Sequence, residues 1–194
     1  MSASRLPRIP PLDPAHMSPE QKRIHDLIAS GPRGQVRGSL AVWLHRPALA
    51  ESAQALGRYC RYETSLPARL LEWAVLLIAR YWGSEYEWWT HRPLALKAGI
   101  SEALVDALRD GRPVNCQRPD EALVLEFLHV LHTQRHVPRE LYDRLVHLVG
   151  EAGVIDLVGV AGYYTLISMT LNVFDIRPPA DTVCELGGPP ADLG

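Results

Sequence analysis

Apolar residues recur at intervals of three and four along most of the chain, which is the spacing of one face of an α-helix. No segment alternates apolar and polar residues for long enough to predict a β-strand. The clearest amphipathic segment covers residues 120–135, where the repeating apolar positions are Leu123, Val124, Phe127, Leu128 and Leu131. The pattern therefore predicts an all-α fold with about seven helices.

Helix-start and turn residues delimit the first of these segments. Ser18 is expected to cap a helix that has Pro19 at its first position and Gln21 at its third. A glycine-rich loop over residues 31–38 ends that helix. Because this loop follows no strand and no Gly-Lys-Ser/Thr sequence closes it, a surface loop is favoured over a phosphate cradle. Residues 40–45 predict a short apolar turn.

The chain divides into one domain with an arm at each end. Residues 1–17 are proline-rich and lack periodicity, which indicates an extended arm. Residues 18–175 are expected to form the helical domain, in which Gly150 ends one helix and 152–174 form the last. Residues 176–194 are rich in proline, glycine and acidic residues, which predicts a flexible tail.

The composition is that of a soluble globular protein, with 47% hydrophobic and 22% charged residues. The net charge of −2 argues against nucleic acid or an anionic membrane as the main partner. Residues 1–14 lack the continuous apolar stretch of a secretory signal. Polar residues interrupt the segment 154–174, which favours a buried helix over a membrane span. We therefore expect a cytoplasmic protein that binds neither nucleic acid nor membrane.

Titratable side chains gather where two predicted helices meet at Gly83. Glu72 lies near the start of the first helix, which is apolar nearly all round. In the second helix, Ser84, Glu87 and His91 recur at intervals of three and four and share one face. A carboxylate beside an imidazole makes a proton-transfer pair near neutral pH. From the spacing alone, a surface ion pair in the second helix is favoured over such a site.

The motif Glu72-(eleven residues)-Ser84-x-x-Glu87-x-x-x-His91 resembles that of the carboxymuconolactone decarboxylase and AhpD-like family. An Ala-Gly-Ile-Ser sequence follows it, and the likeness extends over roughly residues 18–178. Three further stretches carry the resemblance: 65–72, 162–164 and 171–174. The resemblance implies an AhpD-like helical bundle in which these side chains converge on one cavity.

The AhpD branch of this family has Cys-x-x-Cys where this chain has Ser84 and Glu87. The cysteines of this chain, Cys60, Cys116 and Cys184, are scattered and lie outside the motif, so they predict neither a disulfide framework nor a redox pair. Without a thiolate in the motif, the thiol route to peroxide reduction is not expected. The sequence is in this respect similar to the decarboxylase branch. That likeness implies a cofactor-free lyase, decarboxylase or isomerase acting on a small carbonyl or lactone compound.

In such an activity, His91 is the expected general acid and base, and Glu72 or Glu87 is expected to orient it. The expected substrate-binding residues are Ser84, Tyr86 and His45. The resemblance also implies a homo-oligomer, whether a trimer, a hexamer or a dimer-based assembly. It implies a small-molecule substrate and no cofactor or metal.

Two alternatives stay open at this point. Glu72, Glu87 and His91 supply oxygen and nitrogen ligands for a metal, although His45 or His129 would have to provide a second imidazole. Alternatively, the polar residues form a structural network in a non-catalytic oligomer whose apolar helix faces pack between subunits. A cavity that reaches His91 would favour catalysis, whereas a side chain filling that space would favour the structural role.

Overall fold

The computed structural model describes residues 7–188, and every regular element in that range is helical. One turn of 3₁₀-helix at Pro14–His16 precedes eight α-helices. Their bounds are α1 (Pro19–Ala29), α2 (Ser39–Trp43), α3 (Pro47–Tyr62), α4 (Ala68–Trp82), α5 (Glu85–Lys97), α6 (Glu102–Arg109), α7 (Pro119–Gln134) and α8 (Arg139–Phe174). The predicted all-α fold class is therefore confirmed.

Local sequence signals account for several helix ends. Ser18 and Gln21 form the predicted capping box at the start of α1, each side chain bonding the other's backbone N–H. Residues 39–43 form a helix where a turn was expected, because burial of their apolar side chains stabilises a segment with no helix signal of its own. The backbone leaves the helical region at Gly150 (φ 75°, ψ 167°), so α8 is broken there as the sequence predicts.

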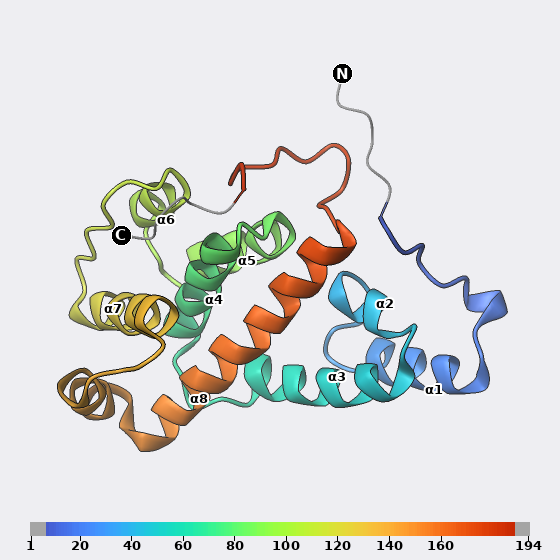
Figure 1. Ribbon diagram of the computed structural model, residues 1–194, viewed down its shortest axis with the longest axis horizontal. Coiled ribbons are helices and arrows are strands. Elements are labelled where there is room, and N and C mark those ends of the chain that lie inside the picture. The colour runs from blue at the N-terminus through green and yellow to red at the C-terminus, as the bar shows by residue number, and fades with distance from the viewer. Residues whose placement is uncertain (1–6, 189–194) are drawn as a thin grey trace.

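The helices are arranged around α8, which crosses the middle of the molecule (Figure 1). α4 packs along α8, and α5 packs against α4. α1, α2 and α3 lie on one side of α8, and α6 and α7 lie on the other (Figure 1). The core therefore lies along α4, with α5 held between the two groups.

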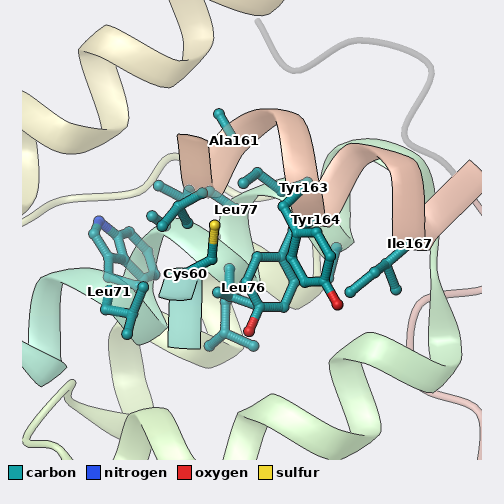
Figure 2. Close-up of a cluster of buried hydrophobic side chains, with 14 of the residues drawn as sticks. Cys60, Leu71, Leu76, Leu77, Ala161, Tyr163, Tyr164 and Ile167 are labelled. Carbon is teal, nitrogen blue, oxygen red and sulfur yellow. The ribbon is translucent and has the colours of Figure 1, made fainter. Parts of the chain in front are cut away.

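The core is built on α4 because this helix is apolar nearly all round and can be enclosed on every side. Trp73 and Leu76 are fully buried in it. Figure 2 shows the side chains of Tyr163 and Tyr164 extending from α8 into the same cluster, beside Cys60 of α3 and Leu76. Two tyrosines with hydroxyl groups in an apolar core mark the place where the core approaches the polar motif.

α8 is long and apolar enough to cross a membrane, judged by length and composition only. Its buried residues, among them Leu145, Leu157 and Leu171, face the helices that surround it. The break at Gly150 further divides it. These features are typical of the central helix of a globular domain.

The segment before α1 is held to the end of α8. The backbone N–H of Arg8 donates to the carbonyl oxygen of Phe174 at 3.0 Å, and the Arg8 guanidinium donates to the carbonyl oxygen of Val173 at 2.8 Å. Residues 7–13 otherwise run without a helix, in keeping with the expected arm. Residues 1–6 of that arm lie outside the described residues.

The segment after α8 differs from the expected flexible tail. Residues 185–187 contact α5, where the buried carboxylate of Glu85 accepts hydrogen bonds from the three successive backbone N–H groups of residues 185, 186 and 187, at 2.8–2.9 Å. Leu186 is buried beside them. A carboxylate that satisfies three backbone donors holds residues 185–187 in place. Residues 189–194 lie outside the described residues.

Candidate functional site

The corner between α4 and α5 positions the motif. Gly83 ends α4 in the left-handed conformation (φ 57°, ψ 34°), which glycine adopts without steric cost. The chain therefore turns sharply, and α5 packs back against α4. This turn brings Glu72, near the start of α4, next to His91 in α5.

His91 is buried, with 1% of its surface exposed, and lies between two carboxylates. Its Nδ1 is 2.7 Å from Oε2 of Glu72, and its Nε2 is 3.4 Å from Oε2 of Glu87. Because a carboxylate only accepts, Glu72 fixes the proton on Nδ1. Nε2 is then the nitrogen that gains or loses a proton. The predicted convergence of these three residues is observed.

Glu87 is the unusual member of this group. Its carboxyl group is buried, and among residues 7–188 it makes no hydrogen bond. Burial raises the pKa of Glu87, although the positive charges of His91, Arg61 and Arg33 oppose that rise. Burial therefore favours the neutral, protonated form of Glu87, whose carboxyl group lies 3.4 Å from Nε2 of His91.

Two tyrosines of α8 lie next to each other near the imidazole, and one of them contacts it. The ring of Tyr164 packs edge-on against His91, with 5.2 Å between the ring centroids. Tyr163 packs against Tyr164 and has its hydroxyl 3.4 Å from Nη2 of Arg33. Burial raises the pKa of Tyr164 well above its ordinary value and that of Tyr163 to about 12. Both phenols therefore stay protonated at neutral pH.

A cavity of about 160 Å³ opens onto His91 and Glu87. It lies between the loop over residues 31–38, the end of α3, α5 and α8. Its polar lining residues are Arg33, Gln35, Arg37, Ser39, Arg61, Tyr62, Tyr86, Glu87, Thr90, His91 and Tyr164. Its volume suits a molecule about the size of a benzene ring. Among residues 7–188, no side chain fills this space.

Three of the predicted site residues, His91, Glu87 and Tyr86, line the cavity. Glu72 lies behind His91 and contacts it without lining the cavity. Ser84 does not line the cavity: it is fully buried at the glycine corner, and its hydroxyl has no hydrogen-bond partner within the described part of the chain. The expectation that its hydroxyl binds substrate is therefore not met by this geometry.

His45 also lies away from the cavity. Its Nε2 is 3.0 Å from the carbonyl oxygen of Pro10, so the imidazole contacts the segment that precedes α1. His45 lies in the turn between α2 and α3, and the apolar sequence before it does not show which way this turn faces. The expectation that His45 binds substrate is corrected accordingly.

Sequence reasoning missed the cations of the cavity. Arg33 and Arg37 come from the glycine-rich loop and Arg61 from the last turn of α3. These residues are separated along the chain from the motif and show no periodic pattern. The only available signal was the pair of arginines among the glycines of residues 31–38, which was interpreted as a surface loop.

The cysteines take no part in the site. All three are free: Cys60 is buried, Cys116 is partly buried and Cys184 is exposed. Burial raises the pKa of Cys60 and of Cys116 to about 11, so these thiols are not ionised near neutral pH. None of the three lines the cavity at His91.

The motif is also poorly arranged for a metal ion. Across residues 7–188, no group of three histidine, cysteine, aspartate or glutamate residues is placed to hold one. The carboxylates of Glu72 and Glu87 face opposite nitrogens of His91 rather than one common point. A single imidazole uses only one nitrogen for a given metal.

A second and larger cavity of about 500 Å³ lies between α4, α7 and the loop that follows α6. Its lining is mainly apolar and includes His129 and His132 of α7. His132 Nδ1 is 2.7 Å from the carbonyl oxygen of Leu128, and its ring packs against Tyr81. None of the motif residues lines this cavity, so the chemistry is assigned to the smaller one.

Comparison with known proteins addresses the fold. No protein-family model and no curated protein matches the sequence. Among solved structures, the crystal structure of an uncharacterized peroxidase-related protein from Silicibacter sp. TM1040 is similar, with a TM-score of 0.66 over 92% of both chains. The two proteins share a fold. At 13% sequence identity the likeness shows the fold alone, and it agrees with the AhpD-like helical bundle that the motif implied.

Proposed function

We propose that this protein is a cofactor-free acid/base enzyme: a lyase, decarboxylase or isomerase that acts on a small carbonyl or lactone compound. One observation carries the proposal. His91 is buried, its Nδ1 is fixed by Glu72 at 2.7 Å, and its other nitrogen faces a buried carboxyl group at the wall of a cavity. An imidazole held in this way is suited to moving a proton.

The proposed chemistry needs little besides a proton donor. In a decarboxylation next to a carbonyl, the carbon–carbon bond breaks, carbon dioxide leaves, and the electron pair forms an enolate. The enolate carbon then takes a proton, which His91 donates from Nε2. Glu87 restores that proton, and Glu72 stabilises the imidazolium form that donates it. In an isomerisation, the same group removes a proton from one carbon and returns it to another.

A thiol-peroxidase function is disfavoured by the residues of this chain, although the structurally similar protein is described as peroxidase-related. The thiol route needs a thiolate that attacks peroxide and a second sulfur that resolves the product. Ser84 and Glu87 occupy the two motif positions. The three free cysteines lie elsewhere.

The proposal is tested with a panel of small lactones and keto acids, with carbon dioxide release and product formation followed by NMR. Replacing His91 by Gln is expected to lower turnover by about 100-fold or more, because general acid/base groups contribute on that order. His147→Gln is the control, since this histidine is exposed on α8 away from the cavity. Full activity in the His91→Gln variant would remove His91 from the mechanism.

A non-catalytic oligomeric role is the second candidate, and the surface of α8 favours it. Ile155 is 71% exposed, Val173 56% and Val158 50%, which is unusual for apolar side chains grouped on one helix. We propose that these residues contact a second copy of the chain. The two roles are compatible, and an intact oligomer that turns over no member of the panel would favour the structural one.

A further inference from the structure

Three arginines converge on the cavity that contains His91. Arg33 and Arg37 reach it from the loop between α1 and α2, and Arg61 reaches it from the end of α3. Within residues 7–188, none of the three forms an ion pair with a carboxylate. Most other arginines of this range do: Arg69, for example, pairs with both Asp120 and Glu121.

Each of the three arginine side chains contacts an aromatic residue, although Arg37 is exposed and Arg33 and Arg61 are half-buried. Nη2 of Arg33 donates to the hydroxyl of Tyr163 at 3.4 Å. Gly57 makes this approach possible, because a Cβ atom at that position would lie 2.0 Å from the Tyr163 hydroxyl and 2.7 Å from Nη2 of Arg33. The guanidinium of Arg61 lies over the ring of Tyr62, 5.6 Å from its centroid. That of Arg37 lies over Trp89 at 5.8 Å.

The charges in this cavity do not balance. Three arginines, whose guanidinium groups stay ionised at all relevant pH values, line the cavity, and Glu87 is the only acidic residue among its described lining residues. Burial favours the neutral form of that carboxyl group, which leaves still less negative charge. Positive charges gathered in a half-buried space repel one another unless an anion joins them. The cavity therefore lacks a negative partner.

We infer that Arg33, Arg61 and Arg37 form a binding site for an oxyanion, either a carboxylate or a phosphate group, carried by the small molecule that occupies the cavity. Guanidinium groups bind both anions through paired N–H donors. The inference rests on the proposed function, because the same cavity contains His91. It narrows the substrate to a small anionic carbonyl compound. The anionic end lies at the arginines, which leaves the reacting carbon at the His91 end.

The site is tested by isothermal titration with acetate, pyruvate and inorganic phosphate, and with neutral acetamide as the uncharged counterpart of acetate. The wild-type protein should bind at least one anion, and bind it more weakly as salt rises, but should not bind acetamide measurably. The relative affinities for pyruvate and phosphate distinguish a carboxylate from a phosphate ligand. Binding of acetamide as tight as that of acetate would overturn the inference.

Matched variants localise the binding. Arg33→Gln and Arg61→Gln should each weaken anion binding about 10-fold or more, since each removes a charge-assisted contact. Arg61→Lys keeps the charge and should fall between wild type and Arg61→Gln, which covers the case in which one Gln variant fails to fold. Arg58→Gln is the control, because Arg58 is also in α3 but is exposed and pairs with Glu63. Equal binding by the Arg33, Arg61 and Arg58 variants would overturn the inference.

A His91→Gln variant separates this inference from the proposed function. It should bind the anion within about threefold of wild type, because the arginines remain. Anion binding by both proteins without turnover by either would support the anion site and contradict the proposed enzyme. Absence of anion binding in the wild-type protein would contradict the site whatever the turnover.

Discussion

Two buried glutamates in the first turns of α5 provide a sharp test of the account. Glu85 and Glu87 are each 6% exposed. Glu85 accepts three backbone hydrogen bonds from the segment 185–187, whereas Glu87 makes none within residues 7–188. We predict that Glu85→Gln lowers the free energy of unfolding, whereas Glu87→Gln leaves it unchanged or raises it.

The expected magnitudes follow from these contacts. Glu85→Gln leaves one side-chain acceptor oxygen for three N–H groups, so at least one charge-assisted hydrogen bond is lost and the variant is destabilised by about 2 kcal/mol. Glu87→Gln loses no hydrogen bond and removes the cost of a buried charge, although it also removes the attraction to His91. At pH 7 this variant should equal the wild type or exceed its stability by up to about 2 kcal/mol.

The pH dependence of the free energy of unfolding tests independently whether Glu87 stabilises or destabilises the fold. The pKa of Glu87 is raised above its ordinary value of 4.5 because the carboxyl group is desolvated. The folded protein therefore holds this proton more tightly than the unfolded chain. The contribution to stability is fully present below pH 4.5 and is lost as pH rises through the folded pKa, by about 1.4 kcal/mol per unit of pKa difference. The Glu87→Gln variant has no carboxyl group at this position, so this loss of stability with rising pH does not occur in it.

The assay is urea unfolding of the three proteins at a series of pH values between 4.5 and 8. The free energy of unfolding of the wild type minus that of Glu87→Gln isolates the contribution of Glu87. The difference should become more negative as pH rises. Two results would refute the claim that Glu87 is held in a destabilising environment. One is a Glu87→Gln variant that is destabilised as much as Glu85→Gln. The other is a free energy of unfolding that rises with pH in the wild type relative to Glu87→Gln.

Two further predictions concern packing around the site. Asp156 accepts hydrogen bonds from the Tyr59 hydroxyl at 2.5 Å and from the backbone N–H and hydroxyl of Ser65 at 2.7 Å each. Desolvation raises the pKa of Asp156, but these hydrogen bonds outweigh it and keep that pKa below its ordinary value of 3.8. Asp156→Ala should lower the free energy of unfolding by about 2–3 kcal/mol at pH 7 in urea unfolding, and this difference should shrink as pH falls below 3.8, where the wild-type carboxylate takes up a proton. Gly57→Ala should lower it by about 1–3 kcal/mol and weaken anion binding, because the new methyl group displaces Tyr163 and Arg33. Gly159→Ala is the matched control: no atom lies within 4 Å of a Cβ there, so thermal unfolding should show no loss and a gain of up to about 1 kcal/mol. Destabilisation by both glycine variants alike, or none by Asp156→Ala, would contradict these assignments.

The sequence predicted the parts of the site that depend on local geometry. The glycine corner and the helical spacing were enough to bring Glu72, Glu87 and His91 together, because a turn and a helix face are encoded by neighbouring residues. The expectation that Ser84 binds substrate was based on helical spacing alone, and that spacing does not show which side of the corner faces the cavity. Ser84 shares the helical stripe with Glu87, but at the corner that stripe faces the protein interior rather than the cavity.

The remaining features depend on contacts between distant segments. Arg33, Arg61 and Glu87 line one cavity only because α1 packs on α3, α3 packs on α8, and α5 packs on α4, which itself packs on α8. No periodic pattern marks a loop arginine that faces a cavity. The contact of residues 185–187 with Glu85 uses backbone N–H groups, which carry no side-chain signature. The composition of that segment alone therefore indicated disorder.

The central claim is that His91 moves a proton to or from a small anionic carbonyl compound. Hydrogen–deuterium exchange at carbon measures this directly: the protein is incubated with pyruvate and related keto acids in D₂O, and loss of the proton signals next to the carbonyl is followed by NMR. The account predicts exchange catalysed by the wild-type protein for at least one of these acids and about 100-fold slower exchange with His91→Gln. Equal exchange rates in the two proteins, or no catalysed exchange by the wild type, would contradict it.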